Sequence, residues 1–140
     1  MASQIGKSAW KVIPMFESRS IARTVEFYTT KLGFELGSVK PEDGTSQPFF
    51  CSIFMGKKAE ANFYFSKVDN EGFKSSEAMV ALGTSEFDEY YTHLKGLGDV
   101  EFHEDVEDKP WGFRQFTIGD SDGNRLTFFK FLEGGNPGEE

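Results

Sequence analysis

The chain has 140 residues, of which 38% are apolar, and it carries a formal net charge of −8. This size and composition fit one compact soluble domain over residues 1–140, and no apolar run approaches the ~20 residues that cross a bilayer. The acidic balance argues against a nucleic-acid partner, which needs clustered Lys and Arg. It would favour a cationic ligand, although an acidic balance is more often simply a way to keep a protein soluble.

Cys51 is the single cysteine, so an internal disulfide is excluded and a reducing cytoplasm is favoured. The first ten residues lack the apolar core of a secretory signal, which also predicts a cytoplasmic protein. Cys51 lies in the apolar run PFFCSIFM, so we expect a buried small side chain rather than a nucleophile. The 16 Phe exceed what a modest core needs, and we expect some rings to line a pocket or an interface.

The first half, about residues 10–68, reads as a strand, a helix and three more strands. The segment WKVIPMF (10–16) predicts a strand that Pro14 restricts to an edge, a bulge or a hinge, because proline donates no ladder hydrogen bond. An amphipathic helix follows, with Ser18 or Ser20 as its cap, Ile21, Val25, Tyr28 and Leu32 as its apolar stripe, and Gly33 at its end. Strands are then expected at 34–39, 49–56 and 60–68.

The second half, about residues 76–132, repeats this order. It predicts a strand at 77–83, a helix capped by Ser85, a strand at 99–105 and a hairpin of 113–118 with 124–131. The helix stripe is Phe87, Tyr90, Tyr91 and Leu94, and the acidic residues Glu104, Asp105, Glu107 and Asp108 are expected in a polar loop. The repeat therefore predicts an α+β fold of two paired βαβββ modules that share one core, with loose chain ends.

The stretch GDSDGNRLTFF (119–129) resembles a calcium loop, because Asp120, Asp122 and Asn124 alternate around a glycine. An EF-hand needs glycine at the sixth position and Glu at the twelfth, whereas Gly123 stands fourth and Phe131 twelfth, counting from Asp120. Aromatic and β-branched runs flank an Asp-Gly pair, which is typical of a hairpin turn. We therefore expect a turn here.

Two stretches, VEFYTTKLGF (25–34) and KPWGFRQFTIGDSDGNRLTFF (109–129), resemble the vicinal oxygen chelate superfamily of glyoxalase I, extradiol dioxygenases and bleomycin resistance proteins. The likeness covers about residues 11–132, and the second stretch is most similar to bleomycin resistance proteins. It implies a curled mixed sheet with helices on its outer face. It also implies a homodimer in which the strand bearing Pro14 packs on or crosses to the partner.

The same resemblance implies where metal ligands would stand, and those positions hold Thr127, with Ile13 and Met79 near the other two. None is a ligand for a hard or borderline divalent ion, so we expect no metal and no cofactor. The alternative is a metal site formed by His103 with Glu104 and Asp105. Neighbouring side chains along a strand point to opposite faces, however, so these residues could share an ion only if the strand bends. No catalytic motif is recognised.

Strand alternation places Phe116, Ile118, Leu126 and Phe128 against the helices, and Gln115, Thr117, Thr127 and Phe129 on the other face. In the resembling family that face forms a cup whose ligand crevices lie at the dimer interface, with aromatic walls matched here by Trp111 and by Phe49 or Phe50. The candidate ligand-binding residues are thus Trp111, Phe49, Phe50, Gln115, Thr127 and Phe129. Simple core and interface packing of these rings is the alternative.

The expected function is metal-free, non-catalytic binding and sequestration of a small, flat, cationic molecule of the bleomycin type. Gly37 and Ser38 stand where antibiotic-binding proteins carry an acidic and aromatic pair, which weakens the specific case for bleomycin. The alternative is a metal-independent lyase or isomerase on the same scaffold, which would need an ionisable side chain facing the cup. A homologue without any ligand is a third reading.

Overall fold

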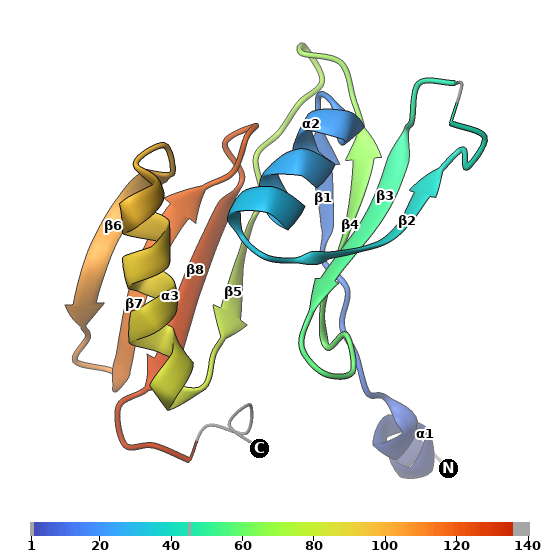
Figure 1. Cartoon of the computed structure of the whole chain (residues 1–140). Helices are drawn as coiled ribbons and strands as arrows, with labels where there is room; N and C mark the ends of the chain where they lie inside the picture. The colour runs from blue at the N-terminus through green and yellow to red at the C-terminus, as the bar shows by residue number, and fades with distance from the viewer. Residues whose placement is uncertain (1, 45, 136–140) are drawn as a thin grey trace.

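The computed structural model describes residues 2–44 and 46–135, and it confirms the α+β fold with two successive βαβββ repeats (Figure 1). The first repeat contains β1 (Met15–Ser18), α2 (Ile21–Glu26) continuing as the π-helix η1 (Phe27–Lys31), β2 (Glu35–Lys40), β3 (Phe50–Met55) and β4 (Ala61–Lys67). The second contains β5 (Glu77–Ala81), α3 (Thr84–Leu97), β6 (Glu101–Asp108), β7 (Phe113–Gly119) and β8 (Arg125–Phe131).

Hydrogen bonds join these strands into two four-stranded sheets, in the orders β1-β4-β3-β2 and β5-β8-β7-β6. Each is mixed, because its first strand runs parallel to its neighbour while the other pairs are antiparallel. The two sheets therefore repeat one topology, and the single curled sheet that the resemblance implied is divided into two. Figure 1 shows a helix lying across one face of each sheet.

Aromatic side chains fill the space between each helix and its sheet. Tyr28 of η1 meets Phe65 edge to face with ring centroids 5.1 Å apart, and Phe87 of α3 meets Phe116 at 5.3 Å. Cys51 is also fully buried, and this burial raises the pKa of its thiol to about 12, so it is a core residue as expected. The abundant Phe residues thus build much of the core: Phe16, Phe34, Phe63, Phe65, Phe87, Phe116 and Phe128 are all buried.

Local signals explain the start and end of the first helix. The Ser20 hydroxyl caps it by accepting a hydrogen bond from the Arg23 N–H at 3.2 Å. Gly33, with φ of +78°, turns the chain out of the helix, as the sequence predicted. The second helix was predicted less well: it begins at Thr84 after Gly83 as its N-cap, so the assignment of Ser85 to that role was wrong.

Three further expectations also differ from the structure. The first strand was expected at 10–16 but begins at Met15, after Pro14, whose carbonyl accepts a hydrogen bond from the Tyr64 N–H at 3.1 Å. The N-terminal segment expected to be loose forms helix α1 (Ala2–Ser8). Strand β6 continues to Asp108 through the acidic residues assigned to a loop, because it is a sheet edge where charged side chains reach water.

Among the described residues, no helix is both long and apolar enough to cross a membrane.

Candidate functional site

The segment Lys109–Gly112 is a tight turn that places Trp111 at the end of the second sheet. The Gly112 N–H donates to the Lys109 carbonyl at 3.0 Å, and the Lys109 N–H donates to the Phe113 carbonyl at 2.7 Å. Pro110 stands at the second turn position, where its fixed φ is favoured, and Gly112 takes a φ of +93°. The turn leaves the Trp111 side chain 60% exposed.

The face of the second sheet that points away from α3, here called the cup face, carries the polar and aromatic residues predicted from strand alternation. Gln115 and Phe129 pair across β7 and β8, as do Thr117 and Thr127. The two threonine hydroxyls are hydrogen bonded at 2.7 Å. On the opposite face Phe116, Ile118, Leu126 and Phe128 are fully buried, so the predicted alternation is confirmed.

An open cavity of about 460 Å³ lies over the cup face and the Trp111 turn. Its lining residues are Glu77, Ala78, Met79, Trp111, Phe113, Gln115 and Thr127. Three of the candidate residues, Trp111, Gln115 and Thr127, therefore line one cavity. A fourth, Phe129, does not line the cavity but stacks on the lining residue Phe113, with ring centroids 4.5 Å apart and an interplanar angle of 17°.

The two remaining candidates lie on the first sheet and do not line this cavity. Phe50 packs edge to face on Tyr64 with ring centroids 5.0 Å apart. Phe49 precedes β3, and 59% of its surface is exposed. Within one chain these rings are therefore separate from Trp111, and a shared cleft would require a second copy.

Glu104 on β6 is a cup-face residue that sequence reasoning missed. Its Oε1 accepts hydrogen bonds from Gln115 Nε2 at 3.0 Å and Thr117 Oγ1 at 3.4 Å, and its Oε2 accepts one from Lys109 Nζ at 2.6 Å. The Lys109 ammonium and then the Gln115 amide hold the pKa of the Glu104 carboxyl below its usual value. The cup face thus carries a carboxylate that is held in place by Gln115 and Thr117 and is paired with the Lys109 ammonium.

The positions that would hold metal ligands carry side chains with other roles. The Thr127 hydroxyl is hydrogen bonded to the Thr117 hydroxyl, and Met79 is 52% exposed in the cavity wall. His103, Glu104 and Asp105 do not gather as the alternative metal site requires. The His103 Nε2 lies 3.2 Å from a Glu101 carboxylate oxygen, and the Asp105 carboxylate accepts hydrogen bonds from the Tyr91 hydroxyl and the Val106 N–H. Nowhere in residues 2–44 and 46–135 do three or more His, Cys, Asp or Glu side chains gather so that they could hold an ion.

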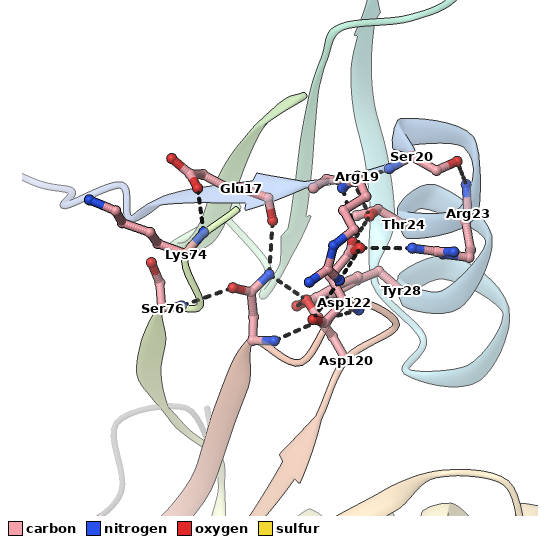
Figure 2. A network of polar contacts seen from close by, with 12 residues as sticks. Glu17, Arg19, Ser20, Arg23, Thr24, Tyr28, Lys74, Ser76, Asp120 and Asp122 are labelled. Carbon is pink, nitrogen blue, oxygen red and sulfur yellow. Dashed lines mark hydrogen bonds and ion pairs between the residues drawn. The ribbon is translucent and has the colours of Figure 1, made fainter. Parts of the chain in front are cut away.

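The aspartate-rich stretch is a turn, as predicted: the Asp120 N–H donates to the Asn124 carbonyl at 2.8 Å, and Gly123 takes a φ of +97°. Its side chains, however, are buried and join the two halves of the chain (Figure 2). Asp122 pairs with Arg23 at 2.7 Å, and the Tyr28 hydroxyl donates to Asp120 at 2.8 Å. Burial raises the pKa of the Asp120 carboxyl.

Comparison with known proteins agrees with this architecture. Residues 18–128 match the profile of the Glyoxalase/Bleomycin resistance protein/Dioxygenase superfamily. A bleomycin resistance protein of Geobacillus stearothermophilus is 28% identical over 137 residues, covering 86% of this chain and 96% of that protein. A bleomycin resistance protein of Staphylococcus aureus strain N315 matches with the same identity and coverage.

Solved structures share the fold. TioX from Micromonospora sp. ML1 superposes with a TM-score of 0.71 at 17% identity, covering 89% of this chain and all of that one. A lactoylglutathione lyase from Agrobacterium tumefaciens superposes with a TM-score of 0.68 at 15% identity, covering 91% of this chain and 97% of that one. The profile match spans most of the chain, from the last residue of β1 into β8. The chain therefore belongs to the glyoxalase/bleomycin resistance protein/dioxygenase superfamily.

Proposed function

We propose that this protein binds and sequesters a small, flat, cationic molecule of the bleomycin type, without a metal and without catalysis. The observation that carries the proposal is that the exposed indole of Trp111 and the carboxylate of Glu104 are hydrogen bonded to the same Gln115 side chain on the cup face. Relatives named bleomycin resistance proteins match over 86% of the chain, which supports the same class of ligand.

The indole is held in an orientation suited to stacking. Trp111 Nε1 donates to Gln115 Oε1 at 3.3 Å, which fixes one edge of the ring while 60% of the residue stays exposed. A large aromatic side chain with few rotatable bonds binds a flat ring at a low entropy cost. The carboxylate held by the same glutamine then attracts the cationic part of that ligand.

A homodimer would complete the cleft, and exposed apolar side chains support it. Val12 and Met79 line a common depression, and Met79 also lines the cavity that contains Trp111. Val12, Met79 and Trp111 are 84%, 52% and 60% exposed, so three large apolar side chains are available to a partner between the N-terminal arm and the cup face. In the proposed dimer, the exposed Phe49 and the neighbouring Phe50 of the second copy form the other wall of the cleft.

Glu104 also bears on the alternative, a metal-independent lyase or isomerase, because such an enzyme needs an ionisable side chain on the cup face. A general base acting near neutral pH requires a raised carboxyl pKa, whereas the pKa of Glu104 is lowered. A carboxylate whose pKa is lowered stays ionised near neutral pH, so it is better suited to binding a cation than to accepting a proton. The proposal places the protein in the cytoplasm, where its single thiol stays reduced.

Calorimetric titration with bleomycin tests the proposal, followed by recovery of the drug from the complex. We expect saturable binding, a higher melting temperature in excess drug, and chemically unchanged drug afterwards. Chemical conversion of more drug than the amount of protein present would favour the enzyme. Absence of both heat and thermal shift would reject bleomycin-type sequestration.

A further inference from the structure

Lys109 holds a position on the cup face that a ligand's cation would also take. Its Nζ lies 2.6 Å from Glu104 Oε2 and 5.7 Å from the centre of the Trp111 ring, and its side chain is only 12% exposed. An ammonium in this position has a carboxylate on one side and an aromatic ring within reach of a cation–π contact. The proposed binding site would present the same two groups, a carboxylate and an aromatic ring, to a cationic aromatic ligand.

Gln115 fixes the geometry between these groups. Its amide nitrogen donates to Glu104 at 3.0 Å, and its amide oxygen accepts from Trp111 at 3.3 Å. One side chain therefore sets where the carboxylate lies relative to the indole. A ligand that stacks on Trp111 brings a cationic substituent toward Glu104, and thus toward the Lys109 ammonium.

Lys109 also has a second partner that it can keep when it leaves Glu104. Glu107 Oε2 lies 3.3 Å from Lys109 Nζ, and the Glu107 side chain is 63% exposed at the outer edge of the sheet. The long lysine stem can swing toward Glu107 without losing every charge partner. Displacement from Glu104 therefore leaves the ammonium paired.

We infer that Lys109 is a built-in competitor of the ligand: its ammonium binds Glu104 beside Trp111 and must be displaced by a guanidinium or amine carried on the ligand's aromatic group. The inference rests on the proposed function and adds a selectivity element to it. A neutral aromatic compound can only stack on Trp111. A cationic one can also bind the Glu104 carboxylate, but only if it displaces Lys109. A guanidinium is favoured over an ammonium, because its planar donors can bind both carboxylate oxygens.

The test is a calorimetric titration of four variants with bleomycin and with bleomycinic acid, which keeps the aromatic bithiazole but lacks the terminal cationic amine. Lys109→Met removes the competitor, Lys109→Arg strengthens it, and Glu104→Gln removes the shared anion. The matched control is Lys57→Met, which changes the net charge equally at an exposed turn of the first sheet. Melting curves without ligand establish that each variant is folded.

We expect Lys109→Met to raise the affinity for bleomycin about threefold or more, and Lys109→Arg and Glu104→Gln to lower it by a similar factor. Lys57→Met and every titration with bleomycinic acid should change much less. If Lys109→Met weakens binding, lysine supports the ligand rather than competing with it, and the inference is wrong. It is equally wrong if bleomycin binds and its affinity is the same for Lys109→Met as for the native protein, while a complete absence of bleomycin binding rejects the proposed function as well.

Discussion

Asp122 and Arg23 stand 99 positions apart in the sequence, yet the Arg23 guanidinium lies 2.7 Å from the Asp122 carboxylate. Arg23 belongs to the helix of the first repeat, and Asp122 to the turn between the last two strands of the second. The same carboxylate accepts hydrogen bonds from Arg19 at 3.3 Å and Thr24 at 3.3 Å, as Figure 2 shows. The two repeats are therefore tied together by a buried charge.

Replacing Asp122 with Ala should destabilise the protein by about 2–3 kcal/mol, because several charge-assisted hydrogen bonds lose their acceptor while the half-exposed Arg23 can regain water. Urea unfolding measures this loss. Asp99→Ala is the matched control: Asp99 also joins the two repeats, through Lys31 at 2.7 Å, but its side chain is 59% exposed. Equal losses in the two variants would contradict a special role for the buried carboxylate.

Tyr28→Phe should produce a loss of stability that depends on pH. The Tyr28 hydroxyl donates to Asp120 and lowers the pKa of that carboxyl, opposing the larger rise caused by burial. Because the folded-state pKa of Asp120 exceeds its unfolded value, protonation favours folding, and this contribution is lost as pH rises through the folded pKa. Removing the donor raises the folded pKa further, so the variant should lose about 1–3 kcal/mol at neutral pH and less in acid.

Tyr90→Phe is the control for that experiment. The Tyr90 hydroxyl donates at 2.6 Å to the carbonyl of Leu32, an acceptor that does not titrate. Its loss of stability should be the same across the pH range, as measured by urea unfolding at several pH values. A Tyr28→Phe deficit that is also independent of pH would show that Asp120 does not respond to its donor.

The proposed homodimer predicts unequal effects of the same substitution, to Glu, at two exposed apolar sites. Met79 is 52% exposed in the cavity wall, and Leu97 is 40% exposed at the end of α3. Met79→Glu should convert a dimer to monomer at tens of micromolar, because a charge buried in an interface lacks a partner. Leu97→Glu should not. Sedimentation velocity distinguishes them, and a monomeric native protein would reject the dimer.

Strand patterns predicted most of the fold from the sequence. The hairpin of β7 and β8 alternates aromatic and polar residues, and this placed Phe116 and Phe128 in the core and Gln115 and Thr127 on the cup face. Successive side chains along a strand point to opposite faces of the sheet, so alternation in the sequence predicts which face each side chain occupies. Sequence proximity was also sufficient to bring Trp111 next to Gln115, four residues away.

Contacts between distant segments could not be predicted in the same way. Glu104 was assigned to a polar loop because acidic residues crowd its neighbourhood, yet two irregularities in the pairing of β6 with β7 keep it on the cup face. The aspartate-rich turn was recognised from its local spacing, but its partners Arg23 and Tyr28 lie about ninety or more residues earlier. Such pairings depend on how the two repeats pack and not on local propensity.

The central claim is that Trp111 stacks on a flat, cationic ligand, and the most direct measurement is the affinity for bleomycin of the native protein and of Trp111→Ala. Loss of the stacking face should cost about 1–3 kcal/mol by analogy with base stacking, which is roughly a fivefold to more than a hundredfold loss of affinity. Trp10→Ala, which removes an indole that is 71% exposed outside the cavity, should have a much smaller effect. Binding that is present and unchanged in Trp111→Ala would contradict the proposed site.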